Sequence, residues 1–143
     1  MGAVSVTDVE VAGQAYRIGV VDARAQFHIV RRLAPALGQL AKGHGASAVD
    51  ALPAMASAIA VMSDEDADYC VFGLLKVVQR KQVNGLGWGP VCVGTTLAYQ
   101  DIDMSVMLQL AWHAAKLNMN GFFAALPSDL KDAIQKASDP SAG

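Results

Sequence analysis

The chain has 143 residues, a formal net charge of −2, an isoelectric point of about 5.8 and 53% hydrophobic residues. This length predicts one domain whose core needs no metal or disulfide support, and the near balance of charge excludes general electrostatic binding of DNA or RNA. Because the mean hydropathy is +0.31, either several helices are buried almost all round or apolar surface is kept for a partner.

Two short strands, at 4–10 and 15–21, are the first predicted elements. Both runs are rich in valine, isoleucine and tyrosine, which favour strands. The sequence VAGQ at 11–14 supplies the turn between them. An N-terminal β-hairpin is therefore expected ahead of the helical part of the chain.

The first predicted helix begins at Asp22, a good N-cap, and is strongly amphipathic. Its apolar residues from Phe27 to Leu40 fall on one broad arc, which we expect to pack in the core. Pro35 lies inside this helix and predicts a kink. The opposite arc carries the basic side chains Arg24, His28, Arg31 and Arg32. This basic arc is either a solvated face or an electrostatic contact with an acidic partner.

A second and a third helix follow the glycine-containing loop after the first. The second is predicted at 48–62, with Pro53 near its start, where proline is tolerated. The third is predicted from 64 to about 81, because acidic residues at its start and basic residues at its end suit the helix dipole. Tyr69 and Phe72 fall off the main apolar arc of this third helix.

The last third of the chain is predicted to hold the central helix. A loop at 84–90 and a short strand within 91–99 precede it. The helix itself, at about 104–120, is apolar almost all round, as is typical of a helix in the middle of a bundle. A short last helix is expected at 129–137.

These elements predict a mainly α (α+β) fold, in which an N-terminal β-hairpin is followed by a bundle of four to five helices. The predicted parts are a single domain at 1–138, the hairpin at 4–21, the bundle at 22–137 and a flexible tail at 139–143.

We find no segment typical of a membrane span and no signal peptide. Cys70 and Cys92 are expected to be buried thiols in a cytosolic protein.

No catalytic, cofactor or metal site is expected from the sequence. The three histidines are far apart, and none is paired with a histidine or a cysteine at metal-ligand spacing. No nucleophile elbow, zinc-binding helix motif or dinucleotide-binding glycine pattern is present. A catalytic cysteine–histidine pair stays open as an alternative, because such residues need not be neighbours in the sequence. The sequence nevertheless favours a protein that is not an enzyme.

Four stretches resemble the tail assembly chaperones of long-tailed bacteriophages: YRIGVVDARAQFHIVRRLAPAL (16–37), VVQR (77–80), GWGPV (87–91) and DIDMSVMLQLAWHAAKLNMNGFF (101–123). Chaperones of this family coat the long tape measure protein, keep it soluble and help tail tube subunits to assemble around it. The resemblance thus implies a non-enzymatic protein of the host cytoplasm. The implied partners are the tape measure protein and, as a further candidate, the tail tube protein, with no nucleic acid, membrane or cofactor.

A chaperone for a long helical client needs an adaptable apolar groove. The candidate partner-contacting residues are Leu108, Trp112, Met119 and Phe123 on and after the fourth helix, Tyr69 and Phe72 on the third, and Arg24, Arg31 and Arg32 on the first. Six methionines either add adaptability to such a groove or fill the core. High apolar content also predicts some self-association into a homo-oligomer. The alternative function is a small structural tail or connector component that stays in the virion.

Overall fold

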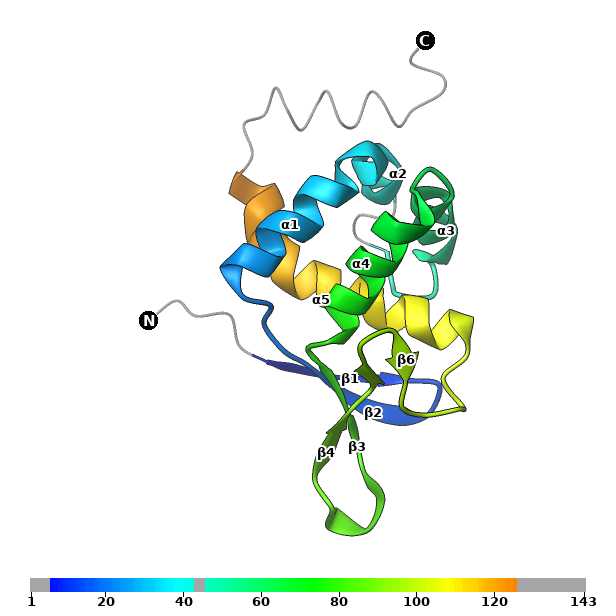
Figure 1. The fold of residues 1–143 in the computed structure, drawn as a ribbon. Helices are drawn as coiled ribbons and strands as arrows, with labels where there is room; N and C mark the ends of the chain where they lie inside the picture. The colour runs from blue at the N-terminus through cyan, green and yellow to red at the C-terminus, as the bar shows by residue number, and fades with distance from the viewer. Residues whose placement is uncertain (1–5, 43–45, 126–143) are drawn as a thin grey trace.

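A layer of helices packs on one face of an antiparallel sheet in the computed structural model, which describes residues 6–42 and 46–125 (Figure 1). The helices are α1 (Ala23–Leu33), α2 (Leu37–Ala41), α3 (Leu52–Ala60), α4 (Asp64–Leu75) and α5 (Met104–Ala125), with 3₁₀ turns η1 (Ala34–Ala36) and η2 (Val83–Gly85). The strands are β1 (Thr7–Val11), β2 (Gln14–Ile18), β3 (Val78–Lys81), β4 (Trp88–Pro90), β5 (Cys92–Val93) and β6 (Thr96–Leu97). The predicted fold class, a mainly α (α+β) chain with an N-terminal hairpin, is confirmed.

Some predicted segments lie wholly or partly outside the described residues. They are the start of the first strand at 4–5, the last helix at 129–137 and the tail at 139–143. Among the described helices, none combines the length and the apolar character that a bilayer span requires.

The N-terminal hairpin is confirmed, with both of its strands shifted from the predicted bounds. Val11 is paired with Gln14. The two residues between them, Ala12 and Gly13, have φ angles of 51° and 80°, as a type I′ turn requires. Alanine is uncommon in this conformation because its Cβ crowds the following carbonyl group. The turn therefore holds one strained residue.

We expect Ala12→Asn to raise the free energy of unfolding by about 0.5–1 kcal/mol, because asparagine tolerates the left-handed conformation and is favoured at this turn position. The Ala12 side chain is exposed, so packing should not change. Urea unfolding measures the effect, and Ala12→Val, which brings a β-branched side chain to the same position, should lower stability. An asparagine variant no more stable than the parent would contradict the strained turn.

The predicted helix over 64–81 is wrong in its last part. α4 ends at Leu75, and β3 follows it, paired with β2 on one side and β4 on the other. Its side chains alternate, since Val78 is buried against the helices while Gln79 and Lys81 are exposed. β3 and β4 thus extend the hairpin into one sheet of order β1-β2-β3-β4, and β4 occupies part of the predicted loop at 84–90.

The short strand expected within 91–99 is two strands, β5 and β6, which form a separate small hairpin. Its turn contains Gly94, whose φ is 60°. The predicted helix at 48–62 is confirmed in place but is shorter, because the chain enters α3 through a turn at 48–51.

The N-cap and the kink predicted for the first helix are both confirmed. The backbone N–H of Ala25 donates a hydrogen bond to Oδ1 of Asp22 at 2.8 Å, which satisfies one of the free N–H groups of the first turn. Pro35 lies in η1, where α1 gives way to α2. A proline cannot donate to the helix ladder, so the axis changes direction there.

The predicted core face of α1 is wrong at Phe27, which is 63% exposed, whereas Ile29 is 1% exposed. The orientation of α1 about its axis follows from its packing on α4. Gly73 of α4 leaves room for the Ile29 side chain at this contact. A Cβ added at Gly73 would lie 3.2 Å from Cδ1 of Ile29. The missing side chain lets the two helices approach closely on the Ile29 side.

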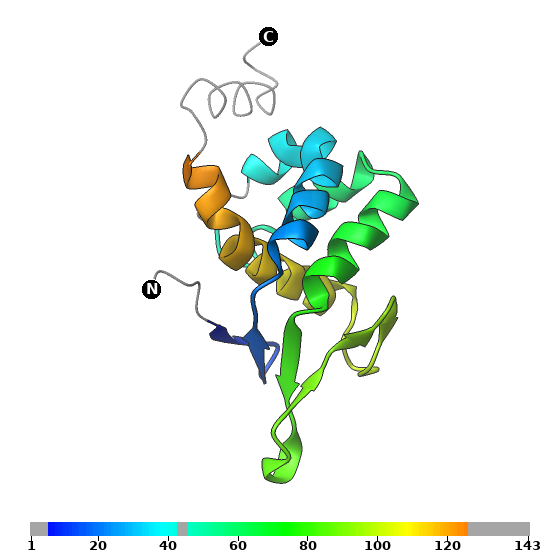
Figure 2. The same ribbon diagram turned by 60° about the vertical axis from the view of Figure 1, so that its left-hand side comes forward.

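α5 is the central helix, as predicted, and packs against α3, α4, β1 and β2 (Figure 2). Its buried polar side chain Asn118 links α5 to the segment between β2 and α1. Oδ1 of Asn118 accepts a hydrogen bond from the N–H of Val21 at 2.7 Å. Its Nδ2 donates to the carbonyl oxygens of Gly19 at 3.1 Å and Ala114 at 2.9 Å. The Asn118 amide thus ties α5 to the segment that leads from the sheet into α1.

Candidate functional site

Three of the predicted groove residues on α5 are core residues in this structure. Leu108, Trp112 and Met119 are 7%, 6% and 2% exposed. The helix has the sheet on one side and α3 and α4 on another, so its second apolar edge is covered as well. These side chains therefore do not form an open groove wall. The side chain of Phe123 lies outside the described part of α5.

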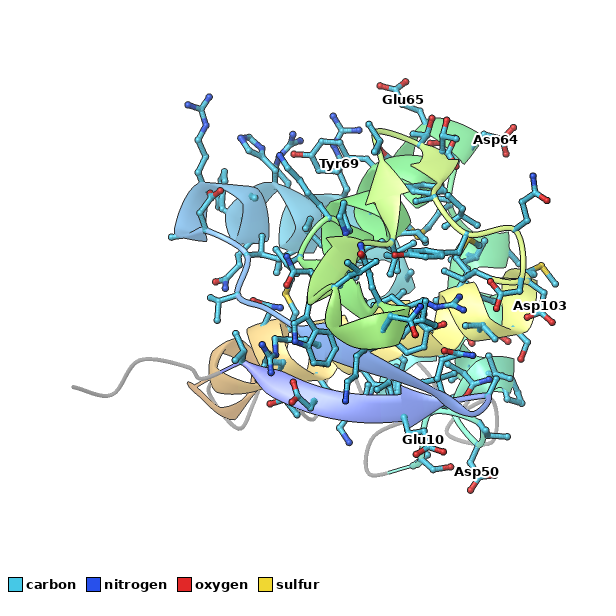
Figure 3. All side chains as sticks on the ribbon, turned by 90° about the horizontal axis from the view of Figure 1, so that it is seen from below. Glu10, Asp50, Asp64, Glu65, Tyr69 and Asp103 are labelled. Carbon is cyan, nitrogen blue, oxygen red and sulfur yellow. The ribbon has the colours of Figure 1, made fainter. Side chains whose placement is uncertain are left out.

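Three other predicted residues come together at a groove of about 690 Å³ between α1 and α4. They are Arg32 on α1 and Tyr69 and Phe72 on α4, brought close because the two helices pack against each other. Phe72 is half-buried and packs on the core, while Tyr69 is exposed. Figure 3 shows Tyr69 on the same edge of the molecule as Asp64 and Glu65, with Glu10 and Asp50 on the opposite edge.

Sequence reasoning missed Val20, which also lines this groove. The signal was present, because Val20 and Val21 are adjacent residues and successive side chains of an extended chain point to opposite sides. Val21 is buried, and Val20 is correspondingly exposed. We define this surface, lined by Val20, Arg32, Tyr69 and Phe72, as the client groove, a name that refers to the client expected from the sequence.

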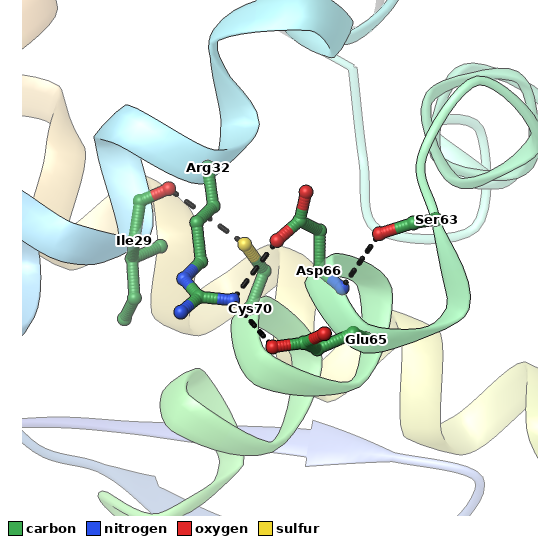
Figure 4. Close-up of polar contacts among 6 residues, drawn as sticks. All are labelled: Ile29, Arg32, Ser63, Glu65, Asp66 and Cys70. Carbon is green, nitrogen blue, oxygen red and sulfur yellow. Dashed lines mark hydrogen bonds and ion pairs between the residues drawn. The ribbon is translucent and has the colours of Figure 1, made fainter.

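The Arg32 side chain in the client groove is held in place by several contacts with α4 (Figure 4). Its Nη1 lies 2.9 Å from Oδ1 of Asp66 and 3.8 Å from Oε1 of Glu65. The guanidinium carbon lies 4.1 Å from the centre of the Tyr69 ring, a cation–π contact. The Nε atom is buried and has no hydrogen-bond partner among the described residues. An unpaired buried donor is costly, and the ion pair with Asp66 and the contact with the Tyr69 ring offset this cost.

The rim of the client groove on the α4 side is acidic. Asp64, Glu65 and Asp66 form the first turn of α4, after the N-cap Ser63. The backbone N–H of Asp66 donates to Oγ of Ser63 at 3.1 Å. Carboxylates at a helix N-terminus are favoured by the helix dipole, which accounts for this cluster without a bound cation. Asp68 adds a further carboxylate along the groove.

The other two predicted arginines, Arg24 and Arg31, are exposed on α1 and do not line the client groove. Among the residues that the structure describes, neither forms an ion pair. The basic arc of α1 thus divides into one arginine held by α4 and two that project into solvent.

The cysteines are buried, as predicted, and their surroundings disfavour a nucleophile. The Cys70 thiol contacts the carbonyl oxygen of Ile29 at 3.7 Å, and burial raises the pKa of Cys70 to about 11. Burial also raises the pKa of Cys92 and lowers that of His113. Among the described residues, no histidine is hydrogen-bonded to either cysteine, and no cluster of three metal-ligating side chains is found.

We expect Cys70 to resist alkylation by iodoacetamide at pH 8 in the folded protein. With a pKa of about 11, about one Cys70 thiol in a thousand is ionised at that pH, and burial blocks access as well. Labelling should become complete in urea and should be read by mass spectrometry, with Cys70→Ala identifying the labelled peptide. Rapid labelling of the native protein at pH 8 would contradict an inert thiol.

Comparison with known protein families gives a match over most of the chain. The family model described as phage tail assembly chaperone protein matches residues 12–131. The matched range covers the groove helices α1 and α4, the sheet from β2 to β4 and the described part of α5. No curated protein and no solved structure matches the chain.

Proposed function

Because the chain belongs to the family of phage tail assembly chaperone proteins, we propose that it binds the tape measure protein during tail assembly and keeps this client soluble. The family gives the chain a chaperone role with a protein partner in tail assembly. The identity of the client, the non-enzymatic character, the tail tube protein as a further partner and the host cytoplasm as the location are our proposals.

The client groove is the observation that carries this proposal. Amphipathic helices bind in apolar grooves through side chains spaced three or four residues apart. Val20, Tyr69 and Phe72 offer apolar surface to such a stripe. The partly exposed guanidinium of Arg32 offers a positive charge to an acceptor beside the stripe. The groove therefore fits an amphipathic client helix with a carboxylate, amide or free carbonyl group next to its apolar residues.

The groove supports weak and reversible binding. Each apolar side chain that becomes fully buried contributes about 1.5–3 kcal/mol, and the cost of association is subtracted from that gain. A few such side chains per groove give modest affinity for one client segment. Many copies along a long client would keep it soluble, and each could still be displaced when tail tube subunits arrive. Arg24 and Arg31 are proposed as additional contacts for acidic client segments.

Affinity purification from infected cells tests the proposal. A tagged chain should co-purify with the tape measure protein before tails are complete, and mass spectrometry of purified particles should not find the chain. A tagged chain recovered without the tape measure protein would contradict the client assignment. Stoichiometric copies in purified particles would instead favour the alternative, a structural tail component.

A further inference from the structure

The solvent side of α1 is a surface that the client groove does not use. We define the α1 face as Arg24, Phe27, His28 and Arg31. Side chains three or four positions apart lie on the same side of a helix, so Arg24, Phe27 and Arg31 follow one another along α1 as a single stripe. All three are exposed, and none of them lines the client groove. α1 itself lies along the edge of the molecule (Figure 3).

Phe27 is the apolar centre of the α1 face. Its side chain is 63% exposed, whereas Ile29 and Leu33 on the other side of the helix are buried. The centroid of the Phe27 ring lies 5.1 Å from that of His28, so the neighbouring imidazole covers one part of the ring and leaves the remainder uncovered. Aromatic side chains and arginine are both enriched in the buried centres of protein interfaces. The stripe therefore has the composition of a binding surface.

The α1 face also carries positive charge. Residues 23–49 include four arginine or lysine residues and no acidic one. Arg32 is paired with Asp66, whereas Arg24 and Arg31 form no ion pair with any residue that the structure describes. These two arginines are seven positions apart, which is about 10 Å along the helix axis. Carboxylates two turns apart on a partner helix match this spacing, so charge complementarity selects an acidic partner.

α1 separates this face from the client groove. Arg32 follows Phe27 by five positions, which corresponds to a rotation of about 140° around the helix axis. Arg32 lies over the Tyr69 ring within the groove, so Phe27 points to a different side of α1. A helix is about 10 Å across, and a single bound helix therefore cannot contact both surfaces. Each surface has room for a segment of its own.

We propose that the α1 face binds an acidic amphipathic segment of the client. Phe27 packs between the apolar side chains of this segment, and Arg24 and Arg31 are paired with carboxylates on either side of them. The choice of the client as partner rests on the proposed function. Because the client groove takes a second segment, one copy of the chain holds two segments of the same client. Two weak sites that act together raise the overall affinity for a long client, since the second segment binds at a high effective concentration.

The first experiment uses overlapping synthetic peptides that cover the tape measure protein of the same phage, with binding read by fluorescence anisotropy. Acidic amphipathic peptides should bind the variant Arg24→Glu with Arg31→Glu about tenfold more weakly than the parent or worse. Phe27→Ser should weaken the same peptides by a similar factor. Circular dichroism establishes that each variant is folded.

The matched control is Lys81→Glu with Lys116→Glu, which makes the same change in net charge at exposed positions outside α1. It should bind these peptides within about twofold of the parent, because salt screens distant charges. Acidic peptides that bind the Arg24→Glu, Arg31→Glu variant as tightly as the parent, or that are weakened equally by the lysine control, would overturn the proposal. If no peptide binds the parent at all, the client assignment fails as well.

The second experiment tests whether the two surfaces are occupied together. A labelled acidic peptide is bound to the parent, and an unlabelled peptide whose binding depends on Tyr69 and Phe72 is added to saturation. The acidic peptide should stay bound, and it should keep its affinity for Tyr69→Ser with Phe72→Ser. Displacement of the acidic peptide by the groove peptide, or its loss in the groove variant, would overturn the separate site on α1.

Discussion

Asn118→Leu should lower the free energy of unfolding by about 3 kcal/mol, because it leaves buried polar groups without partners. Leucine is close in size to asparagine and keeps the site filled. It cannot accept from the N–H of Val21 or donate to the carbonyl oxygen of Gly19, and both bonds are made by Asn118 in the native protein. These two bonds cross from α5 to the segment that leads from the sheet into α1.

Urea unfolding at constant pH measures this loss. The matched control is Lys116→Leu, which makes the same kind of replacement at an exposed position of α5 and should change stability by no more than about 0.5 kcal/mol. A loss below about 1 kcal/mol in Asn118→Leu would mean that water or a local shift satisfies these groups, and that Asn118 does not hold the two layers together.

Tyr69→Ser combined with Phe72→Ser should weaken client binding about 30-fold or more, since aromatic side chains at the centre of an interface contribute most of its affinity. Both residues line the client groove, and Tyr69 is exposed. Binding is measured by fluorescence anisotropy with a labelled amphipathic segment of the tape measure protein. Circular dichroism and urea unfolding establish that the variant is folded before its affinity is compared.

Two further variants distinguish client binding in the groove from nonspecific binding by exposed apolar side chains elsewhere. Val49→Ser with Val61→Ser removes exposed apolar surface elsewhere and should leave client affinity unchanged. Arg32→Lys keeps a positive charge near Asp66 but removes the planar guanidinium that lies over the Tyr69 ring, and it should weaken binding several-fold. A double serine variant that binds as tightly as the parent would exclude the client groove as the binding surface.

The features that follow from local chemistry could be predicted from the sequence. Asp22 caps a helix because its side chain reaches an N–H three residues ahead, and Pro35 breaks the helix because it lacks an N–H. The hairpin turn is set by four consecutive residues. The cysteines are buried because they lie in apolar runs. Each of these outcomes depends on neighbours in the chain.

β3 could not be predicted in the same way, because its partner is distant in the sequence. Arg80 and Lys81 follow directly on α4, and their charge is equally typical of a helix C-terminus. The strand exists because Val78 pairs with Ile18 of β2. That pairing joins segments 60 positions apart. The pattern of residues within 64–81 therefore cannot indicate that a strand partner exists.

The candidate binding surface was harder still to predict, because helical periodicity identifies apolar faces but not which of them is covered. Trp112 and Met119 lie on an apolar edge of α5 that the rest of the fold buries. Phe27 lies on the apolar arc of α1, yet Gly73 lets α4 pack on the Ile29 side instead. Tyr69 and Phe72 were identifiable as groove residues because they lie off the main apolar arc of α4.

Co-expression with the tape measure protein of the same phage tests the central claim most directly. The measured quantity is the fraction of tape measure protein that stays soluble and co-purifies with the chain. The client should be insoluble alone, soluble and bound with the parent chain, and insoluble again with Tyr69→Ser and Phe72→Ser. A client that stays insoluble beside the parent chain, or that is equally soluble with the groove variant, would contradict binding through the groove between α1 and α4.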